Sequence, residues 1–569
     1  MSAPEGVAVR DPRRPYVIGL VAAAVLWGVS AACRDAWTCD DAFIVFRYAR
    51  NLVDGLGLVF NAGERVEGFT DLLWVLWTAP AFVLRLDPET WAHVWGIAAY
   101  GGAILLLGLD HLRFARRSSV PAWAFIPLAA VAAAAHGDWN IWATSGLETS
   151  ALTFVFVAGY VALAAGVPDS RHALLAGVLF GLATLLRPDG VLLAVVGGLF
   201  VIARTRRAGP AVAYASGFLA LCLPAQIFRV VYYGAFVPNT YWAKSANLAW
   251  WDQGFVYLRL YGEKYGVFIL GPVLVLFAIL TLRRDEPVRR ATFASEWAPR
   301  VALAAAFAGV YTIYVVRVGG DFMYARVLIP ATPFFLVLFE LGWTALPRKT
   351  PLLAALAIAA LPVALPSLFP RPMRGQSLVK GVANEWEYYG PKGTTESDFH
   401  GEILRRFFEG LPVRVLIGGS DLRLAYRARI PTVVDAYGLT DPVIAKQPIV
   451  RRGRPGHEKV PSAGYVVDDR KLHLAFSSAF RAYIPVVPIG FGRVRGVLLH
   501  WDPLVLAEWK RRGAVFPDFP ARLDGYIARM PTELDETVKN DYERFRHFYF
   551  QHVSDPAREQ PFRTRLRLP

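Results

Sequence analysis

Long apolar runs, separated by short arginine-rich loops, dominate the first 370 residues of the chain. Eleven of these runs are apolar enough for membrane-spanning helices, although several are short for a hydrocarbon core about 30 Å thick. They cover residues 15–33, 91–112, 121–135, 149–167, 172–186, 190–203, 211–232, 267–282, 301–316, 327–346 and 351–370. The pattern therefore predicts a polytopic α-helical membrane protein with about eleven transmembrane helices.

The run at residues 72–86 decides the predicted topology. It contains two tryptophans and a proline, and it is shorter than a full span. If it lies in the membrane interface, the basic clusters at 113–117, 171, 204–207, 283–300 and 348–349 all fall on the same side as Arg10, Arg13 and Arg14, as the positive-inside rule requires. We therefore expect an interfacial helix here, a cytoplasmic N-terminus, and a C-terminal region on the outer face.

Residues 371–569 have a different composition. They hold 32 Lys and Arg residues against 23 Asp and Glu, and they contain no spanning run. Short β-like runs at 413–417, 432–435 and 482–488 alternate with helical stretches such as 402–408. We expect a transmembrane catalytic domain over 1–370 and, over 371–569, an extracytoplasmic mixed α/β domain that binds the acceptor or caps the site.

Composition and charge limit the possible binding partners of the chain. Of the 569 residues 55% are hydrophobic and 19% are charged, with a net charge of +15. Much of that charge sits in topology-setting loops and no nucleic-acid-binding motif is present, so we expect a lipid bilayer and no nucleic acid. Cys33 and Cys39 could pair on an oxidising face, but we favour free thiols. His136 and Asp138 are too few for a metal site, so we assign no metal.

The predicted topology collects the polar loops on the outer face. They cover residues 40–41, 64–67, 136–138, 144–149, 187–190, 237–244 and 317–326, whereas the cytoplasmic loops are mainly basic. Ionisable residues at a membrane boundary are costly to place and tend to be functional. We therefore expect the protein to work on its outer face.

The polar loops hold the groups that sugar transfer from a lipid phosphate requires. Asp40 or Asp41 can take the proton of an acceptor hydroxyl. We favour Asp40, because it would share a helix face with Arg47 if residues 40–53 form one amphipathic helix. The donor phosphate needs cations, and the candidates are Arg326, Lys244 and Arg187. The candidates for binding the sugar or the acceptor are Arg47, Glu64, Glu67, His136, Glu148, Asn239, Tyr241 and Asp321.

The same residues also have structural interpretations. Asp40 and Asp41 could cap the following helix. Lys244 and Arg326 could extend along the membrane to the level of the lipid headgroups. Asp321, which follows two glycines between two expected spans, needs a cationic partner, and either Arg317 or Arg326 could serve.

The first outer loop resembles a known family. Its motifs are DDAFI with RYA at residues 40–49, GLVFN at 57–61 and GERVEG at 63–68. They are similar to those of the GT-C superfamily of polyprenyl-phosphate-sugar glycosyltransferases, and more narrowly of the terminal β-(1→2)-arabinofuranosyltransferases of mycobacterial cell-wall synthesis. The similarity runs from about residue 15 to 470 and includes SGLET at 145–149, PNT at 238–240, GGDFM at 319–323, GLTD at 438–441 and GRPGHEK at 453–459.

This resemblance implies a GT-C fold and a multi-pass protein of the bacterial cytoplasmic membrane. It implies a polyprenyl-phosphate donor, carrying arabinofuranose, and a cell-envelope glycan acceptor outside. It also implies a catalytic aspartate in the first loop. If donor and product are both β-configured, Asp40 and Asp41 could divide the roles of nucleophile and base. The resemblance leaves both the stereochemistry and a divalent metal open.

Two other classes of function predict different features. A transporter or flippase of lipid-linked sugars predicts charges inside the spans of both halves and an inverted repeat, and the sequence shows neither. A non-catalytic envelope or motility scaffold predicts that substitution of Asp40 and Asp41 is silent while deletion of residues 371–569 is not.

Overall fold

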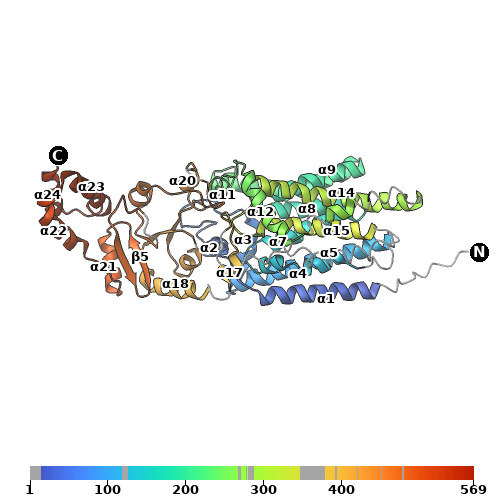
Figure 1. Cartoon of the computed structure of the whole chain (residues 1–569), viewed down its shortest axis with the longest axis horizontal. Coiled ribbons are helices and arrows are strands. Elements are labelled where there is room, and N and C mark those ends of the chain that lie inside the picture. Colours follow the sequence, from blue (N-terminus) through green and yellow to red (C-terminus); the bar gives the residue numbers. More distant parts are fainter. Residues whose placement is uncertain are drawn as a thin grey trace, which may run out of the picture. The chain divides into compact units, whose positions relative to one another are not determined.

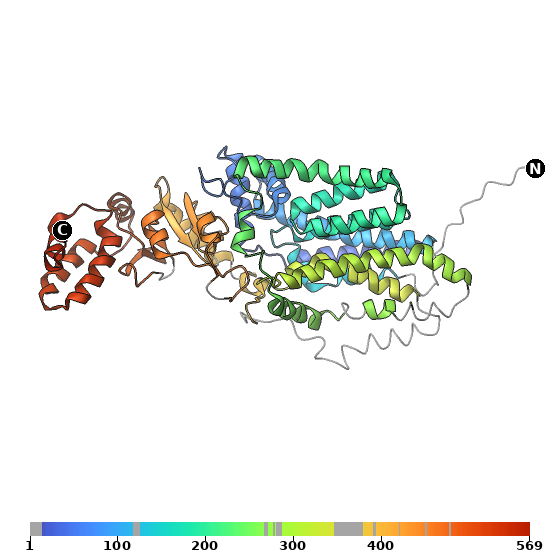
Figure 2. The same ribbon diagram turned by 90° about the horizontal axis from the view of Figure 1, so that it is seen from above.

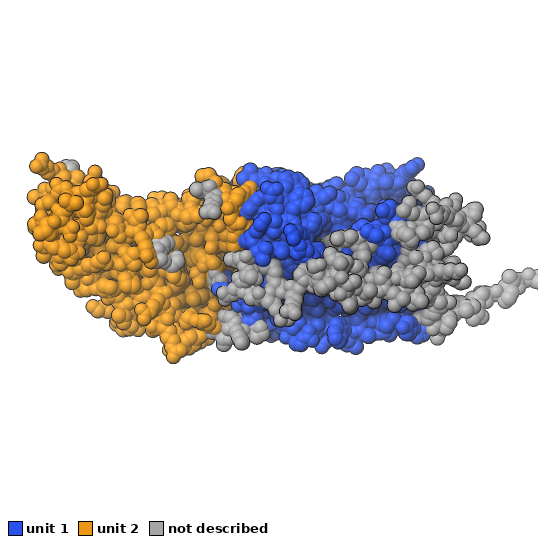
Figure 3. Space-filling model, in the orientation of Figure 1, with its two compact units in different colours: residues 1–42, 70–236, 246–390 blue, residues 43–69, 237–245, 391–569 orange. Residues whose placement is uncertain are grey.

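The chain forms two compact units, shown in different colours in Figure 3. The computed structural model describes residues 14–117, 126–266, 271–276, 279, 287–345, 379–390, 394–419, 421–449, 452–476 and 480–568. Unit 1 comprises residues 1–42, 70–236 and 246–390, and unit 2 comprises residues 43–69, 237–245 and 391–569. The expected domain boundary after residue 370 lies outside the described residues.

Unit 1 is a helical bundle whose long helices run side by side (Figure 1), and Figure 2 shows the same bundle turned by 90°. Five of the described helices are long and apolar enough to cross a membrane, which indicates a membrane protein. The bundle consists of α1 (Arg14–Arg34), α3 (Leu72–Val83), α4 (Pro88–Arg117), α5 (Leu128–Ala134), α6 (Gly137–Trp142), α7 (Thr149–Ala164), α8 (Ser170–Leu186), α9 (Gly190–Thr205), α10 (Ala208–Tyr233), α12 (Trp251–Lys264), α14 (Pro287–Arg317), η2 (Arg326–Ala331), α15 (Thr332–Ala345) and α17 (Glu385–Tyr389).

Small residues let these helices approach closely. A Cβ atom on Gly177 of α8 would lie 2.1 Å from the Tyr214 carbonyl oxygen of α10. One on Gly217 of α10 would lie 2.5 Å from the Leu174 carbonyl oxygen of α8. The two backbones are therefore in direct contact, as is common where membrane helices associate by van der Waals packing.

Most of the expected spans coincide with helices. The expectation is met by α1, α4, α7, α8, α9, α10, α14 and η2 with α15. The expected span 351–370 lies outside the described residues, as do much of 267–282 and the start of 121–135. The number eleven and the interfacial placement of α3 therefore stay predictions.

Unit 2 contains the expected mixed α/β domain. Its five-stranded sheet has the order β2-β1-β3-β5-β4, with β1 parallel to β2 and β3, and β5 antiparallel to β3 and β4. The strands are β1 (Arg414–Ile417), β2 (Thr432–Asp435), β3 (Leu474–Ala475), β4 (Val487–Phe491) and β5 (Val494–Leu498). The strand expected at 482–488 was placed too early, because β4 begins only at Val487.

The helices of unit 2 come from three parts of the chain. Phe43 and Phe46 of α2 contact the Tyr426 ring of α19, with ring centroids 5.3 and 6.4 Å apart, so the first-loop helix belongs to this unit. The helical elements are α2 (Ala42–Val53), α11 (Asn239–Ala243), α18 (Thr394–Phe408), α19 (Leu422–Arg427), α20 (Pro442–Ala445), η3 (Tyr465–Asp469), α21 (Pro503–Arg511), α22 (Phe519–Arg529), η4 (Met530–Thr532), α23 (Asp535–Phe545), η5 (Arg546–Phe550) and α24 (Pro556–Arg565).

Candidate functional site

The acidic pair lies in a turn that is held against the loop before α7. The Cys39 backbone N–H donates to the Ser145 carbonyl at 2.8 Å, and the Trp37 indole N–H donates to the Ile141 carbonyl at 2.9 Å. Asp40 is 4% exposed, whereas Asp41 is half-buried. The helix α2 begins at Ala42, so Asp40 is not on a common helix face with Arg47, and that reason for favouring it was wrong.

Glu148 joins two of the expected phosphate-binding arginines. Its Oε1 atom lies 3.1 Å from Arg187 Nη1 and 3.2 Å from Arg326 Nη2, and the residue is 1% exposed. Burial opposes ionisation of this carboxyl, but the two arginines outweigh it and lower its pKa. Glu148 is therefore an ionised bridge between Arg187 and Arg326.

Arg326 is the most enclosed cation of this group. Its Nη1 atom lies 3.8 Å from Asp321 Oδ2, so Arg326 is the one of the two expected partners that the structure pairs with Asp321, and Asp41 also interacts with it electrostatically. Arg326 follows Ala325, whose φ of +67° is a strained value for a residue with a Cβ. Its Nε is buried, and among the described residues no acceptor meets it. A buried guanidinium N–H without an acceptor is costly, so this atom is available for an anionic ligand.

Arg187 is held from its other side. Its Nη2 atom lies 3.1 Å from Asp189 Oδ2, and the Tyr311 hydroxyl donates to the same oxygen at 3.0 Å. Burial opposes the charged form of Arg187, but the negative charges of Asp189 and Glu148 outweigh it and raise the pKa of Arg187 well above its ordinary value. The structure thus brings Arg187, Arg326, Glu148 and Asp321 together in one charged cluster, which we call the arginine cluster.

Asp71 also belongs to this cluster, although the sequence analysis did not select it. The Trp74 indole N–H donates to the Gly146 carbonyl at 2.9 Å and so holds the start of α3 against the loop that carries Glu148. Asp71 is 5% exposed. Burial, followed by the negative charge of Glu148, raises the pKa of its carboxyl to about 7. The only available signal was its place directly after the first-loop motif.

His136 belongs to a different polar cluster of unit 1. Its Nδ1 accepts from the Trp139 N–H at 3.1 Å, and its Nε2 lies 2.9 Å from the Tyr261 hydroxyl. Burial lowers the pKa of His136 to about 4, so the imidazole is neutral. The neighbouring Asp138 pairs with Lys264 at 2.9 Å. None of these partners belongs to the arginine cluster.

The remaining expected residues lie in unit 2. They are Arg47, Glu64, Glu67, Asn239, Tyr241 and Lys244. Arg47 donates to the Phe60 and Pro431 carbonyls at 2.7 and 2.9 Å. Asn239 donates to the Gly438 and Leu439 carbonyls at 2.8 and 2.9 Å, and its own N–H meets the Glu67 carbonyl at 3.0 Å.

The other contacts of these residues are also made within unit 2. Glu64 pairs with Arg470 at 2.8 Å, and Tyr241 lies edge-on to Trp242, with 5.2 Å between the ring centroids. The Lys244 side chain lies beside Gly456, where an added Cβ would be 3.8 Å away. Motifs far apart in the sequence therefore meet within unit 2. A role of these residues in substrate binding stays a prediction.

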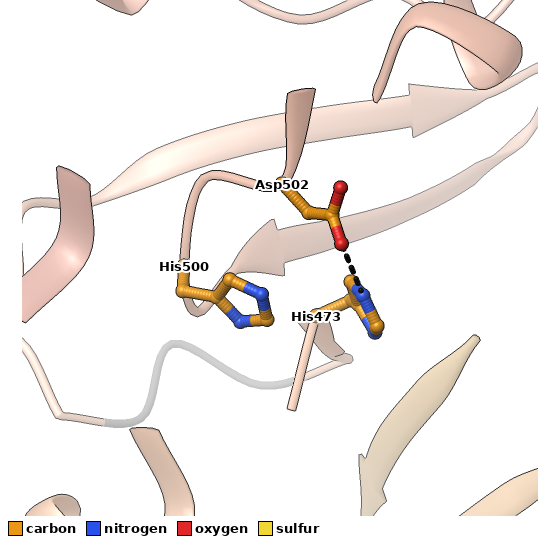
Figure 4. Close-up of side chains that lie close together, drawn as sticks. All are labelled: His473, His500 and Asp502. Carbon is orange, nitrogen blue, oxygen red and sulfur yellow. Dashed lines mark hydrogen bonds and ion pairs between the residues drawn. The ribbon is translucent and has the colours of Figure 1, made fainter. Parts of the chain in front are cut away.

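Cysteines and a cluster of metal-ligating side chains are the remaining candidates for a site. Cys33, Cys39 and Cys222 are free, as expected. Among the described residues, one group has metal-ligating atoms within 4.8 Å of one another, namely His473, His500 and Asp502 of unit 2 (Figure 4). His473 Nδ1 accepts from the Arg414 N–H at 3.0 Å, so the ring proton is on Nε2, 3.3 Å from Asp502. A metal would need that Nε2 lone pair, so this geometry favours a hydrogen-bonded structural group.

Comparison with known proteins supports the expected resemblance. No family model matches the sequence. A terminal β-(1→2)-arabinofuranosyltransferase of Mycobacterium tuberculosis is 33% identical over 361 residues, 57% of this chain and 55% of the relative. One of Corynebacterium glutamicum is 32% identical over 339 residues, 54% of this chain and 48% of the relative. The chain thus spans about half the length of the curated relatives it matches.

The fold comparison points the same way. The crystal structure of ArnT from Cupriavidus metallidurans in the apo state superposes with a TM-score of 0.50. Sequence identity is 14%, and the superposition covers 86% of this chain and 98% of ArnT. ArnT has the GT-C fold, so the expected fold class is confirmed.

Proposed function

We propose that this chain, which has the GT-C fold and resembles terminal β-(1→2)-arabinofuranosyltransferases, is an integral membrane glycosyltransferase. It transfers arabinofuranose from a polyprenyl-phosphate donor to a cell-envelope glycan. The reaction takes place on the outer face of the bacterial cytoplasmic membrane, with the N-terminus in the cytoplasm. The names of the relatives, the acidic pair and the arginine cluster support this proposal.

The observation that carries the proposal is the buried Arg326, which lies within electrostatic reach of Asp41. The two residues interact electrostatically, and the Nε atom of Arg326 is buried without an acceptor among the described residues. A lipid phosphate can supply that acceptor, because charge-assisted hydrogen bonds between arginine and phosphate are strong and directional. The donor sugar is then held next to a carboxylate.

The chemistry follows from this juxtaposition. Asp41 takes the proton of the acceptor hydroxyl as that oxygen bonds to the anomeric carbon of the sugar. The bond from this carbon to the phosphate oxygen breaks, and the electron pair stays on the lipid phosphate. Arg326 and Arg187 stabilise the charge that develops there. We assign the base role to Asp41 because it is more exposed than Asp40 and interacts with Arg326.

Glu148 and Asp321 act on the arginines rather than on the sugar. Both carboxylates contact Arg326, and Glu148 also contacts Arg187. We therefore replace the expected sugar-binding role of these two acids by a positioning role. Two arginines that are already paired stay fixed in position, which lowers the reorganisation needed when phosphate binds.

The test is transfer activity of the purified full chain with synthetic polyprenyl-phosphate arabinose and an arabinan oligosaccharide. We expect Asp41→Asn to lower kcat at least a hundredfold, since a positioned base contributes roughly 10²–10⁴-fold. Asp35→Asn is the matched control, because Asp35 lies in the same segment but pairs with Arg34 at 3.1 Å. This control should keep wild-type activity.

Three results would count against the proposal. If Asp40→Asn and Asp41→Asn both keep full activity, the assigned site is wrong. If the wild-type protein moves the donor lipid across proteoliposomes without forming product, the flippase alternative is correct. If the wild-type protein neither transfers nor moves the donor, while loss of residues 371–569 impairs cells, the chain is a scaffold.

A further inference from the structure

A cavity of about 410 Å³ opens in unit 2, and none of its lining residues has been assigned a role in transfer. Residues 481–483, which precede β4, form one wall, and α23 with η5 forms the other. Asn540, Glu543, Arg544 and His547 line the helical wall at intervals of three and four residues, so they share one helix face. A cavity of this size is typical of small-ligand sites.

Two aromatic rings form a platform in this cavity. The rings of Tyr483 and His547 stack with centroids 4.1 Å apart and planes 28° apart. Asp468 accepts from the Tyr483 hydroxyl and lies 3.0 Å from His547 Nδ1, so one carboxylate holds both rings. The platform is therefore rigid before any ligand arrives.

The backbone around the platform is unusual. Asp468 lies in the π-helical turn η3, and His547 lies in a second π-helical turn, η5. Short π-helical turns are rare and occur frequently at functional sites. Here η3 supplies the acceptor Asp468 and η5 supplies His547, the two partners of one hydrogen bond.

The charges of the lining indicate what kind of ligand fits. Arg544 Nη1 pairs with Asp541 at 3.2 Å, and Glu543 pairs with Arg546 at 2.8 Å, so these charges are internally balanced. The Nε of Arg544 is buried and, within the described part of the chain, has no acceptor. The cavity thus offers single N–H donors, an amide and a carboxylate, without the cluster of unpaired cations that phosphate or sulfate would need.

We infer that this cavity binds an uncharged saccharide. The C–H faces of a sugar ring carry partial positive charge and suit the negative face of an aromatic ring. Its hydroxyls can accept from the guanidinium groups of Arg544 and Arg481 and can donate to Asn540 or Glu543. That the saccharide is part of the acceptor glycan rests on the proposed transferase function.

Saccharide binding by the full chain in lipid nanodiscs tests this inference. The probes are a linear arabinofuranose hexasaccharide, a linear glucose hexasaccharide, and inorganic phosphate as the anionic control. We expect the double variant Arg481→Ala/Asn540→Ala to weaken binding of the arabinofuranose hexasaccharide at least tenfold, measured by saturation-transfer NMR. Both side chains are exposed, so the melting temperature should not change. Lys539→Ala is the matched control, because Lys539 is exposed on α23 but does not line the cavity.

Each outcome has a separate meaning. Wild-type affinity of the double variant for the hexasaccharide would overturn the inference, as would binding of phosphate in place of saccharides at this cavity. Equal, cavity-dependent binding of both hexasaccharides supports a saccharide site without selectivity for the pentose. If binding persists while the wild-type protein shows no transfer, the proposed transferase function fails and the saccharide site stands.

Discussion

Replacing Glu148 by glutamine should destabilise unit 1 and impair its function together. The substitution keeps the shape of the side chain but removes the charge that lies 3.1 Å from Arg187 and 3.2 Å from Arg326. Removing one partner of a buried ion pair costs roughly 3–5 kcal/mol, because the other charge stays buried without compensation. Arg187 keeps Asp189 at 3.1 Å and Arg326 keeps Asp321 at 3.8 Å, which favours the lower end of that range.

A loss of about 3 kcal/mol should be visible in a thermal melt. With about 2 °C per kcal/mol for a domain of this size, the melting temperature should fall by roughly 6 °C. Intrinsic tryptophan fluorescence of the purified protein in one detergent is a suitable measurement. Glu263→Gln is the matched control, since the Glu263–Arg259 pair is exposed and should contribute less than about 1 kcal/mol.

The same variant separates a positioning role from a purely structural one. If Glu148 aligns the arginines for the donor phosphate, kcat/KM for the lipid donor should fall more than tenfold at temperatures well below the melt. Aspartate at this position should restore little of the lost kcat/KM, because its side chain is one methylene shorter and its carboxylate cannot reach both guanidinium groups. If the Glu148→Gln protein has the melting temperature and the kcat/KM of the wild type, Glu148 is not an ionised bridge between Arg187 and Arg326.

Two further predictions concern buried ionisable groups of unit 1. Because folding raises the pKa of Asp71 from 3.8 to about 7, its contribution to stability is complete below about pH 4 and declines as the pH rises towards 7. The melting temperature of Asp71→Asn relative to wild type should therefore rise between pH 5 and pH 8, and a parallel pH dependence in both proteins would contradict the assignment. Asp110 and Arg300 form a buried pair at 2.6 Å, so Asp110→Asn or Arg300→Met alone should cost roughly 3–5 kcal/mol in thermal or denaturant unfolding. The double variant Asp110→Leu/Arg300→Met should recover most of that loss, and strictly additive losses would show that the two residues do not act as a pair.

The acidic pair shows which features of the site the sequence pattern can predict. Its position between the first apolar run and an amphipathic segment made it the leading candidate, and the structure places Asp41 within electrostatic reach of Arg326. The choice between the two acids was wrong in its reasoning, because the helix begins at Ala42 and not at Asp40. Helix ends depend on tertiary contacts, here the bond from the Cys39 N–H to the Ser145 carbonyl, which the periodicity of residues 40–53 does not contain.

Features that depend on local chemistry can be predicted from the order of residues alone. Apolar length predicts the helices of unit 1, turn-punctuated β-like runs predict the sheet of unit 2, and the motifs of the first loop predict the GT-C resemblance. Hydrophobic periodicity and turn residues are patterns of a few neighbouring residues, so the order of residues records them directly.

The pairing of the buried charges depends instead on long-range packing. Glu148 bridges two arginines that are 39 and 178 residues away in the chain, and no periodicity encodes such a pairing. Residues 43–69 and 237–245 join the C-terminal residues in unit 2 because Asn61, Asn239 and Arg47 bond to distant backbone carbonyls. The energy of a buried charge depends on every group around it, and long-range packing alone brings those groups together.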